Sequence, residues 1–146
     1  ATLEVGSNGQ LAVEGDGEVV GGLRGAGIVA LKHSLTLGLG NQDDTFSGNL
    51  IGDGGLTKAG LGTQTLNGRN AFRGPLRVAA GTLEVGGSGD NLGNDTPVEV
   101  DQGAMLRIAG DGEDLATLTG RGRVRADAAL GIGSDVADGS FAGRLE

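Results

Sequence analysis

The sequence predicts an all-β protein, a right-handed single-stranded parallel β-helix, and three observations support this fold class. The 146 residues include 32 glycines but only three phenylalanines, with no tryptophan and no tyrosine. Short runs alternate apolar with polar side chains, and glycine, asparagine or aspartate bounds each run. Long stretches of the sequence also repeat. A sandwich or barrel normally buries large aromatic side chains, so a narrow coil lined by aliphatic residues fits the composition better.

The alternating runs are the predicted strands, because successive side chains of a strand point to opposite faces. The clearest runs, in chain order, are Thr2–Val5, Gln10–Val13, Leu35–Leu37, Thr82–Val85, Val98–Val100 and Leu106–Ile108. No stretch has a convincing helical period, and frequent glycines would weaken any helix. Glycines between the runs are expected at the corners of each coil, where the backbone enters regions that other residues avoid.

The alternation also predicts which side chains form the core. The inward set is Leu3, Val5, Leu11, Val13, Leu37, Leu66, Val78, Leu83, Val85, Val98, Val100, Leu106 and Ile108. The outward set is Thr2, Glu4, Arg77, Glu84, Glu99 and Arg107. Gln64 falls on the inward face, so its amide is expected to be hydrogen-bonded to the backbone or to a neighbouring polar side chain.

The longest repeat has a period of 95 residues: Leu11 matches Leu106 and Phe46 matches Phe141. "ATLEVG" at 1–6 and "GTLEVG" at 81–86 are only 80 residues apart, which indicates about 15 inserted residues near 86–100. The predicted organisation is a single β-helix segment, 1–146, with a partial unit 1–45, a full unit 46–140 and the start of another at 141–146.

One stretch, "FSGNLIGDGGLTKAGLGTQTLNGRNAFRGPLRVAAGTLEVG" at 46–86, resembles the passenger-associated repeat of bacterial autotransporters, the type V secreted proteins. It departs from that pattern at Gln64, usually apolar in the family, and at Phe72, often tyrosine. The resemblance implies a parallel β-helix in a passenger that a C-terminal outer-membrane barrel of the same parent chain exports. It also implies a location on the bacterial cell surface, outside the outer membrane, or secretion.

Three functions follow from this interpretation. The first is a non-catalytic stalk or scaffold segment that supports secretion and folding outside the outer membrane. The alternative is an adhesin-type binding module, virulence-related, whose loops contact a ligand on a host or neighbouring cell, particularly through the insertion near 86–97. A polysaccharide-cleaving enzyme is disfavoured, because the sequence offers no convergent acids and no stacking aromatics. We therefore expect no catalytic, cofactor-binding or metal-binding residues in this segment.

The candidate catalytic residues have simpler explanations. His33 is the only histidine, and the repeat places Ala128 at the equivalent position, so His33 is expected to be exposed and structural. Asp43 and Asp44 resemble an acidic pair of a pectin-degrading β-helix. Adjacent strand residues point oppositely, so these carboxylates would not converge, and we expect a solvated turn.

Two glycine-rich segments resemble ligand-binding loops only in part. In "GGSGDNLGND", 86–95, the aspartate comes one position early for the calcium-binding nonapeptide, and the motif is not tandem. "GDGGLTKAG", 52–60, lacks the spacing of a phosphate-binding loop. The chain has no cysteine for a thiolate site.

The charge pattern limits the partners. Arg121, Arg123 and Arg125 alternate along "GRGRVRA" and should line one outer face, against acidic side chains of neighbouring coils or an anionic glycan. A net charge of −8 without stacking aromatics argues against nucleic acid. No apolar run approaches the ~20 residues that span a bilayer. Because both ends cut through a repeat, the segment is expected to expose uncapped coils and to associate end to end.

Overall fold

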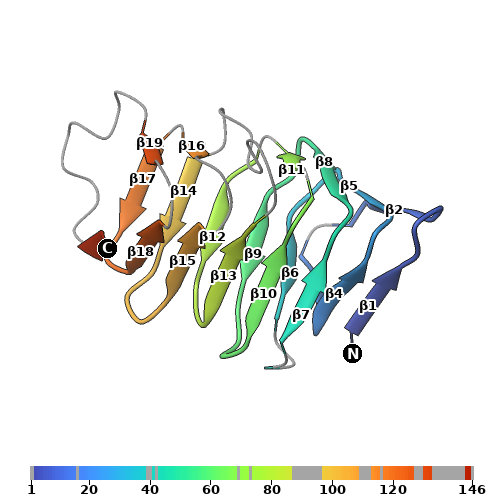
Figure 1. Ribbon diagram of the computed structural model, residues 1–146. Helices are drawn as coiled ribbons and strands as arrows, with labels where there is room; N and C mark the ends of the chain where they lie inside the picture. The colour runs from blue at the N-terminus through green and yellow to red at the C-terminus, as the bar shows by residue number, and fades with distance from the viewer. Residues whose placement is uncertain are drawn as a thin grey trace.

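The computed structural model describes residues 2–15, 17–38, 41, 43–68, 70–72, 74–86, 97–108, 113–115, 117–126, 130–132 and 144–145. Regular structure in these residues consists of short β-strands (Figure 1). They are β1 (Thr2–Val5), β2 (Gln10–Val13), β3 (Glu18–Val20), β4 (Gly22–Gly25), β5 (Ile28–Leu31), β6 (Leu35–Leu37), β7 (Asp44–Phe46), β8 (Asn49–Gly52), β9 (Leu56–Lys58), β10 (Thr63–Leu66), β11 (Asn70–Phe72), β12 (Leu76–Val78), β13 (Thr82–Val85), β14 (Pro97–Val100), β15 (Met105–Ile108), β16 (Glu113–Leu115), β17 (Thr117–Gly120), β18 (Arg123–Ala126), β19 (Leu130–Ile132) and β20 (Arg144–Leu145).

These strands form parallel sheets that run along the molecule. The first sheet has the order β1-β4-β7-β10-β13-β15-β18-β20, the second β2-β5-β8-β11, and the third β3-β6-β9-β12-β14-β17, while β16 pairs with β19. From β1 to β12 the chain visits the first, second and third sheets in turn, and each circuit is one coil (Figure 1). Connections between neighbouring parallel strands are almost always right-handed. The predicted parallel β-helix is confirmed.

One coil is much shorter than the repeat found in the sequence. Partners in the first sheet are separated by 18 residues at Leu106–Val124 and by 23 at Leu83–Leu106. Leu11 lies in β2 of the second sheet, whereas Leu106, its match in the sequence repeat, lies in β15 of the first. The 95-residue separation is therefore not a whole number of coils. The unit boundaries remain a prediction, and most of the proposed insertion lies outside the described residues.

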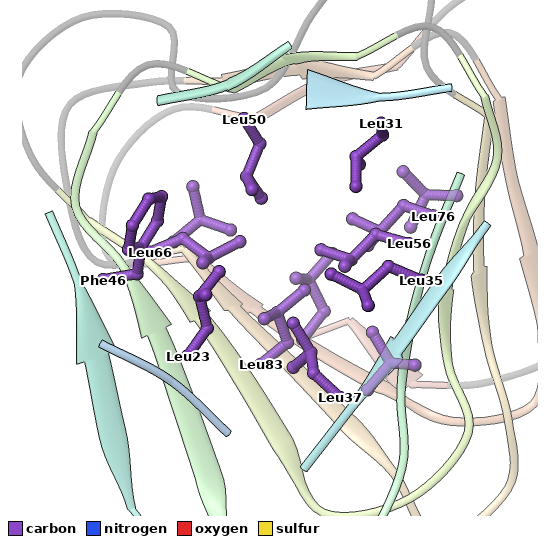
Figure 2. Close-up of a cluster of buried hydrophobic side chains, with 14 of the residues drawn as sticks. Leu23, Leu31, Leu35, Leu37, Phe46, Leu50, Leu56, Leu66, Leu76 and Leu83 are labelled. Atoms are coloured by element: carbon purple, nitrogen blue, oxygen red, sulfur yellow. The ribbon is translucent and has the colours of Figure 1, made fainter. Parts of the chain in front are cut away.

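Aliphatic side chains from the three sheets meet inside the coil (Figure 2). Of the predicted inward set, all are buried except Leu3 and Leu11, which are partly buried because they lie in β1 and β2 at the end of the described stack. The outward prediction is also confirmed: Glu4, Arg77 and Glu99 are exposed, and Glu84 and Arg107 are partly buried. The side chain of Thr2 lies outside the described residues. Each buried leucine contributes about 1.5–3 kcal/mol to folding.

Candidate functional site

Four polar side chains are buried in the described interior, and all come from the strands between β7 and β11. They belong to Asp44, Lys58, Gln64 and Asn70, and the exposed fractions of these whole residues are 4, 0, 1 and 2%. Burial of a polar group costs free energy unless it is hydrogen-bonded. The partners of these four groups therefore show how this part of the coil is specified.

Gln64 on β10 reaches past β7 to the backbone of β4. Its Oε1 accepts a hydrogen bond of 3.0 Å from the backbone N–H of Leu23, and its Nε2 donates one of 2.9 Å to the carbonyl of the same residue. Nε2 also lies 3.3 Å from the carbonyl of Thr65. The side-chain amide thus occupies the place of a peptide group in the sheet. The prediction of an inward, hydrogen-bonded amide is confirmed.

Asp44, at the start of β7, shows where the sequence prediction fails. Its side chain is 1% exposed, and its carboxylate accepts a hydrogen bond from the Nε of Arg24 on β4. Gly22 leaves the space for this carboxylate, since a Cβ there would overlap Oδ2. The prediction of a solvated turn is therefore wrong for Asp44. It failed because the register that brings Gly22 and Arg24 beside Asp44 is not visible in the local sequence.

Lys58, the last residue of β9, is a buried cation at the corner between the third and first sheets. Its Nζ donates hydrogen bonds to the carbonyls of Ala59, at 2.6 Å, and Gly60, at 3.2 Å. Burial lowers the pKa of Lys58, and the charge of Asp43 opposes this shift. The corners of the adjacent coils are glycines, Gly38 and Gly81, where a Cβ would lie 2.9 Å from Nζ. No role of Lys58 could be recognised from the sequence alone.

Polar side chains in the preceding coil also hold the backbone of this region. Asn41 Oδ1 accepts a hydrogen bond of 2.8 Å from the N–H of Leu61, and Asp43 Oδ1 accepts one of the same length from Thr63. Asn70, on β11, donates through Nδ2 to the carbonyl of Gly68 at 3.1 Å. The contacts of Asn41 and Asp43 tie one coil to the next outside the strand ladder, whereas the contact of Asn70 with Gly68 lies within one coil.

The residues considered for catalysis do not assemble. His33 is exposed in the bend after β5, as predicted, and Ala128 lies outside the described residues. Asp43 is exposed whereas Asp44 is buried, so the pair does not converge. Within the described residues, no cluster of three or more histidine and acidic side chains is placed to hold a metal ion. Nor does that part of the chain contain a helix long and apolar enough to cross a membrane.

The two glycine-rich segments have different outcomes. In 52–60, the backbone passes through the end of β8 into β9, and its lysine points to carbonyls inside the protein. Most of 86–95 lies outside the described residues, so the calcium comparison there stays untested.

One of the three arginines of 121–125 borders a hollow on the surface. Arg123 and Arg125 are exposed in β18, as predicted, whereas Arg121 lies in the turn before this strand rather than within it. Arg121 borders a hollow of about 410 Å³. The other lining residues are Ala79, Asp101, Gln102 and Gly120. This hollow combines cationic and amide groups at the corner that leads into the first sheet.

The coils that hold most of the buried polar groups match a known protein family. Residues 56–85, from the start of β9 to the end of β13, match the model of the passenger-associated-transport-repeat family. The chain is a segment of an autotransporter passenger. The match contains Lys58, Gln64 and Asn70, so the family repeat coincides with most of the polar interior.

Two curated relatives extend this similarity beyond the repeat. The passenger segment is 39% identical over 87 residues, 60% of its length, to the adhesin BmaC autotransporter of Brucella suis biovar 1 (strain 1330). It is 36% identical over 102 residues, 70% of its length, to an extracellular serine protease of Serratia marcescens. The aligned parts are only 2% and 8% of those proteins. No solved structure gives a significant match. Passengers of this class are displayed on the bacterial cell surface or secreted.

Proposed function

We propose that this passenger segment is a non-catalytic scaffold, which spaces other parts of its parent chain from the outer membrane and supports export by folding outside the cell. The observation that carries the proposal is the continuous interior, to which successive coils contribute buried side chains from three sheets. Because each coil packs mainly on its neighbours, folding can start at one place and propagate. A folded external portion cannot return through a narrow pore, so folding favours export.

The C-terminal outer-membrane barrel of the parent chain would be the export partner. Self-association is a second proposed contact. Strands β1, β2 and β3 lie at the ends of their sheets, next to a hollow of about 300 Å³ lined largely by apolar side chains. Unpaired strand edges invite pairing with another chain. Light scattering of the isolated segment at high salt should therefore detect oligomers, and a strict monomer would contradict this contact.

The scaffold proposal is tested by placing charges inside the coil. The triple change Leu56→Asp, Leu66→Asp and Leu83→Asp buries three carboxylates and should abolish surface display of the parent passenger, measured by antibody labelling of intact cells. The matched control places three aspartates at the adjacent outward positions, Thr57→Asp, Thr65→Asp and Glu84→Asp.

The control should be displayed as the wild type is. Equal display of the two triple variants would contradict the proposal, because export would then not depend on a folded interior.

Removal of one coil in register tests the spacing role. Val5 pairs with Gly25, so deletion of residues 6–25 joins Val5 to Ala26 at equivalent places in successive coils. We expect normal display and an unchanged activity of other passenger domains per displayed molecule. If display stays normal but binding to a host ligand is lost, the scaffold role is wrong for this segment.

That last outcome would support the second candidate, an adhesin-type binding module. The observation that favours it is the similarity to a protein named as an adhesin. Such a module would contact a host-cell or glycan ligand through its surface and loops. The similarity to a serine protease covers 8% of that protein, and we propose no catalytic role for the present segment.

A further inference from the structure

Arginine side chains gather on the outer face of the first sheet near one end of the described stack. In the paired strands β15 and β18, Met105 is in register with Arg123, and Arg107 with Arg125. The outward positions of these two strands therefore carry three arginines and one methionine. We call Arg107, Arg123 and Arg125 the arginine face. Its density of positive charge contrasts with the net charge of −8 of the whole chain.

The surroundings of the arginine face favour a charged ligand with hydroxyl groups. Glu84 is the next residue in the row and lies 3.5 Å from Arg107, so an acceptor oxygen already approaches this face. Arg121 continues the positive charge from Arg123 into the hollow of about 410 Å³. Gln102 in that hollow offers an amide, and Asp101 a carboxylate that pairs with Arg77 at 2.7 Å. Amide and carboxylate groups are suited to the hydroxyls of a sugar.

We propose that the arginine face, together with the adjoining hollow, binds a linear acidic polysaccharide laid along the axis of the coil. Neighbouring strands are about 4.8 Å apart, which is close to the length of one sugar unit in an extended polysaccharide. Guanidinium groups on successive strands can therefore meet carboxylate or sulfate groups on successive sugars, with paired hydrogen bonds. The proposal names a ligand class for the binding-module function, on which it rests, and it is independent of the scaffold role.

A single-stranded nucleic acid is the competing polyanion. Proteins that hold single strands usually stack bases on aromatic side chains. The chain has no tryptophan or tyrosine, and none of the described residues that line the hollow is aromatic. The amide and carboxylate beside Arg121 also suit sugar hydroxyls better than a phosphate backbone. We therefore favour the polysaccharide.

The test uses the 146-residue chain, three immobilised polysaccharides, and oligodeoxythymidine as the competing polyanion. Heparin carries sulfates and uronates, polygalacturonate carries uronates alone, and dextran is neutral. We expect binding to heparin or polygalacturonate, no binding to dextran, and weaker binding as salt screens the charges. The double change Arg123→Gln and Arg125→Gln should weaken the affinity by about tenfold or more. Far-UV circular dichroism should remain that of the wild type, because both side chains are exposed.

The matched control is Lys32→Glu, which lowers the net charge by the same two units at an exposed position far along the chain. It should bind acidic polysaccharide as the wild type does. An equal loss in the arginine variant and the control, or no loss in the arginine variant, would overturn the proposal. Tighter binding to oligodeoxythymidine than to either acidic polysaccharide would overturn it too. Such a failure would leave binding through the loops intact, since that is measured with the displayed passenger and its host ligand.

Discussion

The interior of this β-helix has two regions of different chemistry. Between β7 and β11 the core leucines share the interior with an acid, a lysine and two amides. From β12 to β18 the buried side chains of the described residues are aliphatic. Both regions contribute strands to the first and third parallel sheets. The difference shows that the fold itself does not require the polar groups, and so they must contribute something that hydrophobic burial does not.

We infer that the polar groups fix the register in which the coils stack on one another. A parallel β-helix with only leucine and valine inside could shift by a coil and bury similar side chains. The amide of Gln64, in contrast, fits the backbone of Leu23 two strands away. A shift would leave that amide without its partner in the interior. Buried polar groups have this role in some other proteins.

The largest expected effect is in the aliphatic region. Leu106→Ala removes a fully buried side chain and should lower the free energy of unfolding by about 2–5 kcal/mol, measured by urea titration. Glu99→Ala, on the outer face of β14, should cost about 0.5 kcal/mol or less. Similar losses in the two variants would mean that the alternation of inward and outward side chains does not carry the stability.

A smaller effect is expected at Gln64, but with a distinct signature. Gln64→Leu leaves the N–H and carbonyl of Leu23 without the side-chain amide and should cost about 1–3 kcal/mol. If the amide fixes the register, hydrogen exchange should also become faster in β4 and β10. If the variant is as stable as the wild type and as well protected from hydrogen exchange, the polar groups do not fix the register of the coils.

The smallest effect is the pH dependence of Lys58. Burial lowers the pKa of this lysine below its ordinary value of 10.5, so between these two pKa values the unfolded chain binds more protons than the folded one. The contribution of Lys58 to stability should therefore rise as pH increases towards 10.5. Lys58→Met should remove this rise. Urea titrations of both proteins from pH 8 upwards, on the alkaline side of neutrality, measure the difference; parallel profiles would contradict it.

The fold and the aliphatic interior could be predicted from the sequence because alternation is a local signal. The inward orientation of Val78 and of Ile108, for example, follows from the alternation of each with the arginine that precedes it. The inward position of Gln64 followed from the same pattern. The hydrogen-bond partner of Gln64 could not be predicted from this pattern, because Leu23 is 41 residues away and the coil lengths vary. A register has to be known before such a contact can be found.

The buried cation and acid were missed for a related reason. Lys58 continues the inward alternation of Leu56, but a lysine at such a position usually indicates a solvated face. Room beside its Nζ is left by Gly38 and Gly81, about 20 residues away on either side in neighbouring coils. The burial of Asp44 depends in the same way on Gly22.

The connection of all coils by one backbone has a mechanical consequence. Each coil adds about 4.8 Å to the height of the stack, whereas its chain, fully extended, spans roughly 70 Å. Tension applied to the two ends loads the outermost strands first, because a terminal coil has a neighbour on one side only. The stack should therefore unwind from its ends, and each coil that peels away releases more than ten times its folded height. Under flow, such a rod lengthens while its middle stays folded.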